Sequence, residues 1–134
     1  MNRLFISCCG RKLEHSARAI DLYKSRQFNL AQQLLELGWE VTIISAKHGF
    51  LDADCIIEPY DQRMTANRSQ EILLRGLREN ISATKNYVFG GELYRRIIRE
   101  LDPCVTELVG ANRGNGDHYS ALKQLSEISN KEQA

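Results

Sequence analysis

The chain has 134 residues, which is enough for one domain with a hydrophobic core and too few for two ordinary domains. Hydrophobic residues make up 43% and charged residues 26%, and the formal net charge is +1. This balance excludes a whole-chain attraction to nucleic acid or to an acidic membrane, so a nucleic-acid contact would have to be local. No apolar run approaches the ~20 residues that span a bilayer, and residues 1–11 become polar too early for a signal peptide. We therefore expect a cytoplasmic protein that does not enter a membrane.

Apolar periodicity predicts strands that alternate with helices. In chain order, we predict a strand at 4–8, one or two helical turns within 16–23, a helix containing 28–35, a strand at 39–44, an irregular segment at 47–66, a helix at 67–81, a strand at 87–89, a helix at 93–101, a weaker strand at 105–109, a glycine-rich loop at 110–116 and a helix at 118–128.

Local signals place several helix ends. Gly38 follows the first long helix, and Pro103 stops the third. Asn67 with Gln70 three residues later is typical of a capping box, and Asp117 could cap the last helix. These signals divide the chain into the elements of a single domain.

Strands separated by helices indicate an α/β fold. We predict a single three-layer domain at 1–125, with a mostly parallel four-stranded sheet and helices on both faces. Strand order 2-1-3-4 is our expectation for the sheet. The polar residues 126–134 are predicted to form a C-terminal tail that frays.

Every predicted strand runs into glycine and polar residues, and ligands of such sheets bind at the carboxyl edge where these segments meet. Glycine permits close backbone approach, and exposed N–H groups near helix starts favour anions. The sequence therefore predicts a pocket for a phosphate-bearing ligand, although strand-to-helix turns also use glycine for purely structural reasons. The candidate ligand-binding residues of these segments are Ser7, Arg11, Lys12, Ser45, Lys47, Gly49, Gly90, Gly91 and Arg113.

The irregular segment adds Tyr60 and Asp61. Tyr60 could stack on a base or a sugar, and Asp61 could bind ribose hydroxyls or act in acid–base catalysis. The structural alternative is that Tyr60 packs the segment down and Asp61 caps a turn. His48 is either a general acid–base group or a hydrogen-bonding residue at a strand end. Glu92 either faces the pocket or only stabilises the positive end of its helix dipole. Tyr94 is expected to point elsewhere.

No cofactor and no metal site are predicted. The glycine patterns match neither the dinucleotide fingerprint nor the Walker A loop, and the three histidines lack metal-site spacing. Cys8 and Cys9 are adjacent, which suits neither a metal site nor a Cys-x-x-Cys motif, and a thiol sensor is one interpretation of the pair. We expect structural roles for Cys55 and Cys104.

Four stretches resemble an uncharacterised bacterial and phage domain family, related more distantly to the YaaA-like peroxide-stress proteins. They are "FISCCGRKL", "ARAIDLYKSRQF", "IISAKHGFLDADCIIEPYD" and "YVFGGELYRRII". Its most specific motifs here are Ser-Cys-Cys with Lys12, Ser-Ala-Lys-His-Gly and Pro-Tyr-Asp, and "GANRGNGDHYSAL" looks like a divergent form of its final turn. The resemblance implies an α/β domain associated with DNA, nucleobases or oxidative stress, and does not name a substrate.

Two functions follow as hypotheses. The first is an enzyme that binds a nucleotide, or a nucleotide unit of nucleic acid, at the carboxyl edge. In it Arg11, Lys12 and Lys47 hold phosphate, and Asp61 acts with His48 or Glu92; the bond we expect to be attacked is an N-glycosidic bond. The second is a non-catalytic DNA-binding module of a stress-response or phage-related system. It would use the same edge and the basic residues Arg95, Arg96 and Arg99.

Overall fold

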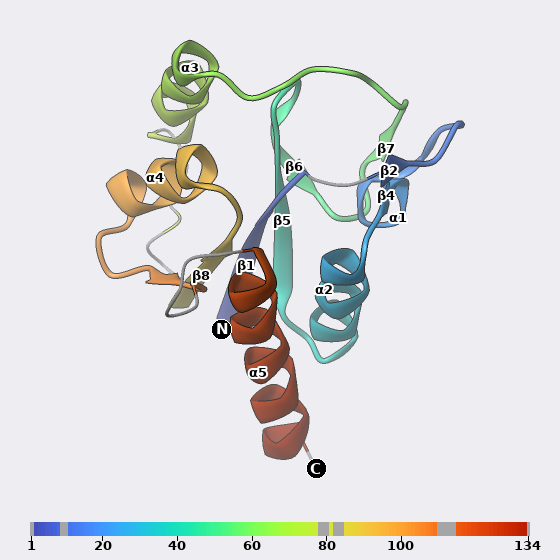
Figure 1. Cartoon of the computed structure of the whole chain (residues 1–134), viewed down its shortest axis with the longest axis vertical. Helices are drawn as coiled ribbons and strands as arrows, with labels where there is room; N and C mark the ends of the chain where they lie inside the picture. Colours follow the sequence, from blue (N-terminus) through green and yellow to red (C-terminus); the bar gives the residue numbers. More distant parts are fainter. Residues whose placement is uncertain (1, 9–10, 78–80, 82–84, 110–114, 134) are drawn as a thin grey trace.

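A five-stranded sheet forms the centre of the computed structural model, which describes residues 2–8, 11–77, 81, 85–109 and 115–133 (Figure 1). Its strands, in spatial order, are β6 (Gly49–Asp52), β5 (Glu40–Ser45), β1 (Asn2–Ser7), β8 (Lys85–Phe89) and β9 (Thr106–Glu107). All neighbours pair in parallel except β5 and β6, which are antiparallel. The fold is therefore mixed α/β with a mostly parallel sheet.

The four predicted strands stand in the predicted order 2-1-3-4, as β5, β1, β8 and β9. The predicted strand number was wrong, because the chain turns back after β5 and adds β6 at the edge. Ser45 pairs with Gly49 across this tight hairpin, and Gly49 adopts the positive φ of 79° that the turn requires. The segment expected to be irregular thus contains a hairpin strand, and a further short strand, β7 (Ile56–Ile57).

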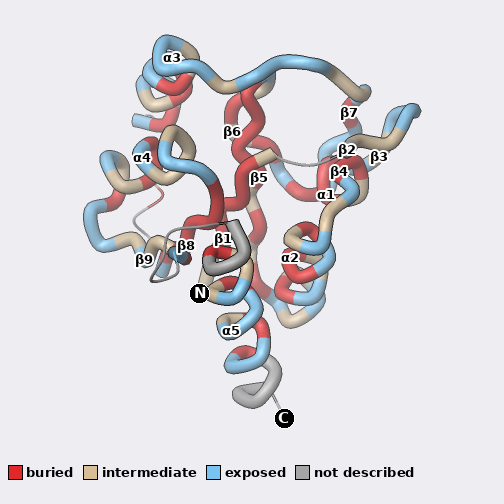
Figure 2. The backbone as a smooth tube through the Cα atoms, in the orientation of Figure 1, coloured by how far each residue is buried: buried red, intermediate tan, exposed pale blue. Residues whose placement is uncertain are grey.

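Helices pack on both faces of the sheet (Figure 1). On one face α2 (Arg26–Glu36) and α5 (Asn115–Gln133) lie side by side, and on the other α3 (Ala66–Gly76) packs against α4 (Glu92–Leu101). Successive residues of β1 point to opposite faces: Leu4 and Ile6 join one hydrophobic core, and Phe5 joins the other. Figure 2 shows this central sheet as buried, with the exposed residues on the outer helical surfaces.

The ends of two helices differ from the prediction. Thr65, not Asn67, caps α3: its hydroxyl accepts a hydrogen bond of 3.1 Å from the backbone N–H of Arg68. The helix begins one residue after Thr65, so Asn67 already lies in its first turn. Helix α5 begins at Asn115, so Asp117 lies within it. Asn and Gly are weak helix formers, and for this reason the pattern indicated a later start.

Residues 11–24 form short elements rather than the predicted helical turns alone. They are β2 (Arg11–Lys12), β3 (Ala17–Arg18), α1 (Ala19–Leu22) and β4 (Tyr23–Lys24). Strand β2 pairs with β4, and β3 pairs with β7. Lys12 and Tyr23 are partners in the first of these ribbons, which places the lysine above the tyrosine-rich region described below.

Helix α5 includes residues 126–133, where a tail was expected, and Ser126 is buried and donates a hydrogen bond of 3.2 Å to Gln33. Within the described residues, no helix is both long enough and apolar enough to cross a membrane.

Candidate functional site

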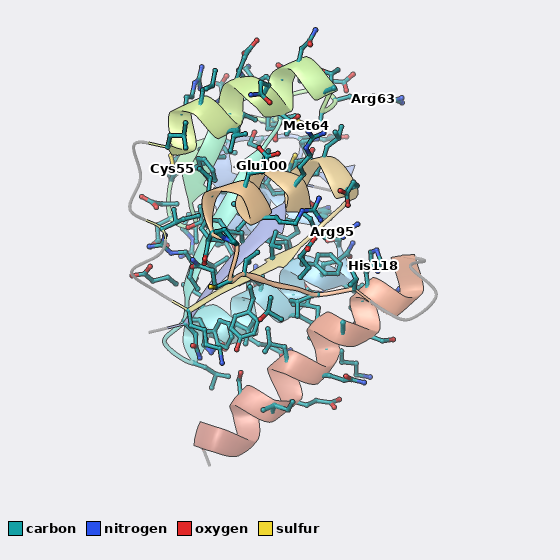
Figure 3. The ribbon with its side chains drawn as sticks, turned by 90° about the vertical axis from the view of Figure 1, so that its left-hand side faces the viewer. Cys55, Arg63, Met64, Arg95, Glu100 and His118 are labelled. Atoms are coloured by element: carbon teal, nitrogen blue, oxygen red, sulfur yellow. The ribbon has the colours of Figure 1, made fainter. Side chains whose placement is uncertain are left out.

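A cleft of about 710 Å³ opens at the carboxyl edge of the sheet. Three parts of the chain form it: Cys8 after β1 with Lys12 of β2, the segment 61–64, and the first turn of α4 with Gly91 before it. Figure 3 shows Arg63 and Met64 at the end of the molecule where α3 and α4 begin. The lining residues are Cys8, Lys12, Asp61, Gln62, Arg63, Met64, Gly91, Glu92, Leu93 and Tyr94.

Besides Gly91, this cleft brings together three charged residues of the predicted site, Lys12, Asp61 and Glu92. They come from positions 49 and 31 residues apart in the chain, and only the fold unites them. A cation and two carboxylates in one cleft can bind a polar ligand and can supply acid–base or electrostatic catalysis. Tyr94 also lines the cleft, so the expectation that it points elsewhere was wrong. The start of α4 borders the cleft, and near the end of a helix two residues such as Glu92 and Tyr94 can face the same space although they point in different directions around the helix axis.

The Lys12 ammonium is held over two aromatic rings. Its Nζ lies 4.7 Å from the centre of the Tyr60 ring and 5.7 Å from that of Tyr23. Such cation–π contacts stabilise a lysine in a fixed place, here at the cleft wall. Lys12 is therefore positioned before any ligand arrives.

Tyr60 is fixed by its hydroxyl group. Its oxygen lies 2.6 Å from the hydroxyl of Tyr23 and accepts a hydrogen bond of 2.7 Å from Ser45 Oγ. Burial raises the pKa of Tyr60 far above its usual value; the bond to Tyr23 adds to this increase, while that from Ser45 opposes it. The ring packs into the core beside α1 and α2. Tyr60 thus supports the cleft, and its surroundings leave it little freedom to stack on a base.

Ser45, Lys47, His48 and Gly49 form the β5–β6 hairpin turn. Ser45 Oγ accepts hydrogen bonds of 3.2 Å and 3.0 Å from the backbone N–H groups of Lys47 and His48. Lys47 is exposed, and neither it nor His48 lines the cleft. The structure therefore does not bring these candidates to Lys12 and Asp61.

The His48 ring packs edge-to-face against Tyr60, with ring centres 5.4 Å apart. Burial lowers the pKa of His48, and the positive charges of Lys47 and Arg68 lower it further. A neutral imidazole packed on a fixed tyrosine is well explained as part of the wall behind the cleft.

Glu92 is the centre of an ion-pair network on α4. Arg99 and Arg95 both bind its carboxylate, the latter at 3.1 Å, and both also bind Glu107 at the end of the sheet. The hydrogen bond from Arg99 lowers the pKa of Glu92, and the nearby arginine charges act in the same direction. Glu92 therefore presents a stable negative charge to the cleft.

The Cys8 thiol lies at the cleft floor. Its Sγ is 3.2 Å from the Tyr94 hydroxyl and accepts a hydrogen bond of 3.4 Å from the backbone N–H of Ala46. Cys55 and Cys104 are exposed rather than structural, and Figure 3 shows Cys55 on the surface of the molecule. Among the residues described, no three His, Cys, Asp or Glu side chains gather as a possible metal site.

The remaining candidates divide between a second cavity and the part of the chain that is not described. Ser7, Gly90 and Gly91 line a separate cavity of about 170 Å³, and Gly91 borders the large cleft as well. Arg113 and the side chain of Arg11 lie outside the described residues. Sequence reasoning missed Gln62, Arg63 and Met64, although they directly follow Pro-Tyr-Asp and adjacency to that motif was an available signal.

The fold and the cleft define an α/β domain with a polar ligand cleft at the carboxyl edge of a mostly parallel sheet. Residues 4–118 match the family described as "Family of unknown function (DUF6884)", and the chain belongs to this family. Comparison with curated proteins and with solved structures gave no match.

Proposed function

We propose that the protein is an enzyme that binds a nucleotide, or a nucleotide unit of nucleic acid, in the large cleft. The observation that carries this proposal is the meeting of Lys12, Asp61 and Glu92 in a space of about 710 Å³. Ligand pockets usually occupy roughly 300–1,000 Å³, and at this edge of a parallel sheet they commonly hold small ligands. The Ser-Ala-Lys-His-Gly and Pro-Tyr-Asp motifs resemble those of an uncharacterised family, distantly related to YaaA-like proteins, whose association with DNA, nucleobases or oxidative stress supports a nucleobase-containing ligand.

The reaction we propose is hydrolysis of an N-glycosidic bond. Water adds to the sugar carbon, the carbon–nitrogen bond breaks, and the base leaves with the bonding electrons and takes up a proton. Positive charge develops on the sugar in the transition state, and a nearby carboxylate stabilises it. Glu92 suits this electrostatic role because its arginine partners keep it ionised. Asp61 is assigned to the attacking water or the ribose hydroxyls.

Lys12 is assigned to the anionic or carbonyl groups of the ligand. Its Nζ is fixed over Tyr60 and Tyr23, so little side-chain entropy remains to be lost on binding. Lys47 and His48, which stand outside the cleft, have no assigned contact with this ligand.

A thermal-shift panel of bases, nucleosides and nucleoside monophosphates tests binding. At least one compound should raise the melting temperature of the wild-type protein. The shift should be lost in Lys12→Met and in Asp61→Asn but kept in Lys47→Met, which removes the same charge outside the cleft. Absence of any shift across the panel, or equal loss in Lys47→Met, would overturn the assignment.

Release of free base, followed by chromatography, tests the reaction separately. Wild-type protein should release base from a bound nucleoside or nucleotide, and Glu92→Gln should slow release while binding persists. Binding without release in wild-type protein would leave the ligand assignment standing and refute the enzyme.

The alternative, a non-catalytic DNA-binding module, draws less support from the surface charges. Arg95 and Arg99 are paired with Glu92 and Glu107, and Arg96 with Glu100, so these arginines offer little uncompensated charge to a phosphate backbone. DNA affinity that falls steeply as salt rises would favour this alternative.

A further inference from the structure

The second cavity, of about 170 Å³, lies next to the large cleft and shares Gly91 with it. A single water needs roughly 10–15 Å³ of such space, so the cavity has room for a larger group. We name it the Ser7 cavity. Its lining residues are Ser7, Arg26, Gln27, Phe89, Gly90, Gly91, His118 and Tyr119.

Three long helices begin around the Ser7 cavity. Arg26 and Gln27 open α2, Gly91 is the N-cap of α4, and His118 lies in the first turn of α5. The first N–H groups of a helix lack partners within the helix, and the helix dipole adds partial positive charge there. Figure 3 shows His118 at the end of α5 that faces the beginning of α4. Three such ends around one space favour an anion.

Ser7 gives independent support for a ligand. It is only 3% exposed, yet within the described residues its hydroxyl has no hydrogen-bond partner. No fully buried side-chain oxygen or nitrogen among the described residues lacks a hydrogen-bond partner, so the Ser7 hydroxyl is open to the cavity that it lines and can bind a group that enters it. A Cβ on Gly90 would lie 2.6 Å from Ser7 Oγ, so the glycine leaves the hydroxyl uncovered.

The charges of the lining residues have one sign. The Arg26 guanidinium lies over the Tyr119 ring, 3.8 Å from its centre, and both residues line the cavity. None of the lining residues that the structure describes is acidic. Glu92, next to Gly91 in the chain, lines the large cleft rather than the Ser7 cavity and is bound by Arg95 and Arg99.

We propose that the Ser7 cavity is an oxyanion site that takes a phosphoryl group, bound by Arg26, the Ser7 hydroxyl and the helix N–H groups. We further infer that this phosphoryl group belongs to the ligand of the large cleft, an inference that rests on the proposed function. Gly91 separates the two spaces without a side chain, so one ligand can reach across it. This arrangement assigns phosphate to Arg26, which was not among the candidate ligand-binding residues, rather than to Lys47.

Titration with inorganic phosphate, followed by backbone amide NMR shifts, tests the cavity alone. Phosphate should shift the amides of Gln27 and Gly91 in wild-type protein and in Lys12→Met. Hydrogen bonds to a charged group contribute about 1.5–3 kcal/mol, so Arg26→Gln should weaken binding roughly tenfold or more. Arg75→Gln removes the same charge from the end of α3 and should not change binding.

Two further variants keep the result interpretable if Arg26→Gln loses its packing on Tyr119. Ser7→Ala should weaken phosphate binding with the melting temperature unchanged, and Arg26→Lys should restore part of the affinity. Three results would overturn the oxyanion site. They are no amide shift in wild-type protein, equal weakening in Arg75→Gln, and binding by an adventitious ion only, with shifts scattered over surface lysines.

Comparison of a nucleoside with its monophosphate separates the two possible sources of phosphate. If the group belongs to the cleft ligand, the monophosphate should bind more tightly than the nucleoside, and Arg26→Gln should remove this difference. If inorganic phosphate binds but the monophosphate gains nothing over the nucleoside, the shared-ligand inference is refuted and the oxyanion site stands. Failure of every nucleoside and nucleotide to bind refutes the proposed function without affecting the phosphate result.

Discussion

The hydroxyl oxygens of Tyr23 and Tyr60 lie 2.6 Å apart and join two segments that are 37 residues distant in the chain. Ser45 extends this contact to the end of β5 through its hydrogen bond to Tyr60. These contacts connect three parts of the fold: the short ribbon of β2 and β4, the central sheet, and the segment that leads to Asp61. The position of the cleft wall depends on this cluster.

Tyr60→Phe should therefore lower the free energy of unfolding. It removes the acceptor of the fully buried Ser45 O–H group, while the backbone N–H groups of Lys47 and His48 still donate to Ser45 Oγ, and an unsatisfied buried donor costs about 1–3 kcal/mol. Urea denaturation measures the loss. Tyr87→Phe is the matched control, because the Tyr87 ring packs on Trp39 at 5.2 Å and its substitution should cost less. Equal losses in both variants would contradict the role of the hydroxyl cluster.

His48 should titrate below 6.5, the usual pKa of histidine, because its burial and the charges of Lys47 and Arg68 disfavour the imidazolium. The unfolded chain then binds this proton more readily than the folded protein. Stability is unaffected by His48 well above pH 6.5 and falls as the pH drops below 6.5. NMR titration of the His48 ring measures the midpoint.

Lys47→Met is the informative variant for this titration. Removal of the lysine charge should raise the midpoint of His48 and reduce the loss of stability in acid. A wild-type midpoint at or above 6.5, or no change in Lys47→Met, would disagree with the packing of His48 described above.

Thr65→Ala should destabilise the protein by about 1 kcal/mol, since the hydroxyl that caps α3 is lost. Asn67→Ala, two residues later, should leave stability unchanged or raise it by a few tenths of a kcal/mol, because alanine is the better helix former. Chemical denaturation of the two variants distinguishes the observed cap from the predicted capping box. A larger loss in Asn67→Ala would favour the box.

Gly90→Ala and Gly91→Ala should behave differently although the two residues are adjacent. A methyl group on Gly90 would lie 2.6 Å from Ser7 Oγ and 3.3 Å from Tyr94 Cβ, and overpacking of this kind costs about 1–3 kcal/mol. On Gly91 it would meet nothing within 4 Å, so the cost should stay below about 1 kcal/mol. Melting curves and urea titrations check both values; similar costs would contradict the geometry.

The parallel core of the sheet was predictable because β1, β5 and β8 are short segments rich in apolar residues, and parallel strands buried on both faces have such composition. The hairpin strand β6 was not, because Phe50 and Leu51 follow a turn rich in polar residues that is also typical of a strand-to-helix connection. Thr65 was passed over in favour of Asn67 since both residue types cap helices and only the backbone decides which one does.

The candidate site was predictable only in its location. The carboxyl-edge rule correctly placed Lys12 and Glu92 near one another, together with Asp61 from the following segment. The rule could not show that the Ser45 and Tyr60 hydroxyls bind each other and are thereby occupied. Arg26 lies in one of the stretches that resemble the family, but no pattern indicated a ligand-binding role, because its place at the Ser7 cavity depends on where α2 begins relative to α4 and α5.

Residues 58–65 form no helix or strand and cross the carboxyl edge from β7 to α3 (Figure 1). Among the described residues, their side-chain hydrogen bonds to the rest of the fold join Tyr60 to Tyr23 and Ser45, and Gln62 to the carbonyl oxygen of Ala46 at 3.3 Å. Such contacts form late in folding and open at low free energy. The crossing segment should therefore exchange its amide hydrogens sooner than β1 and β5 do. A ligand could then enter past a locally opened segment while the sheet stays folded. A bound ligand would increase the fraction of time that this segment spends closed.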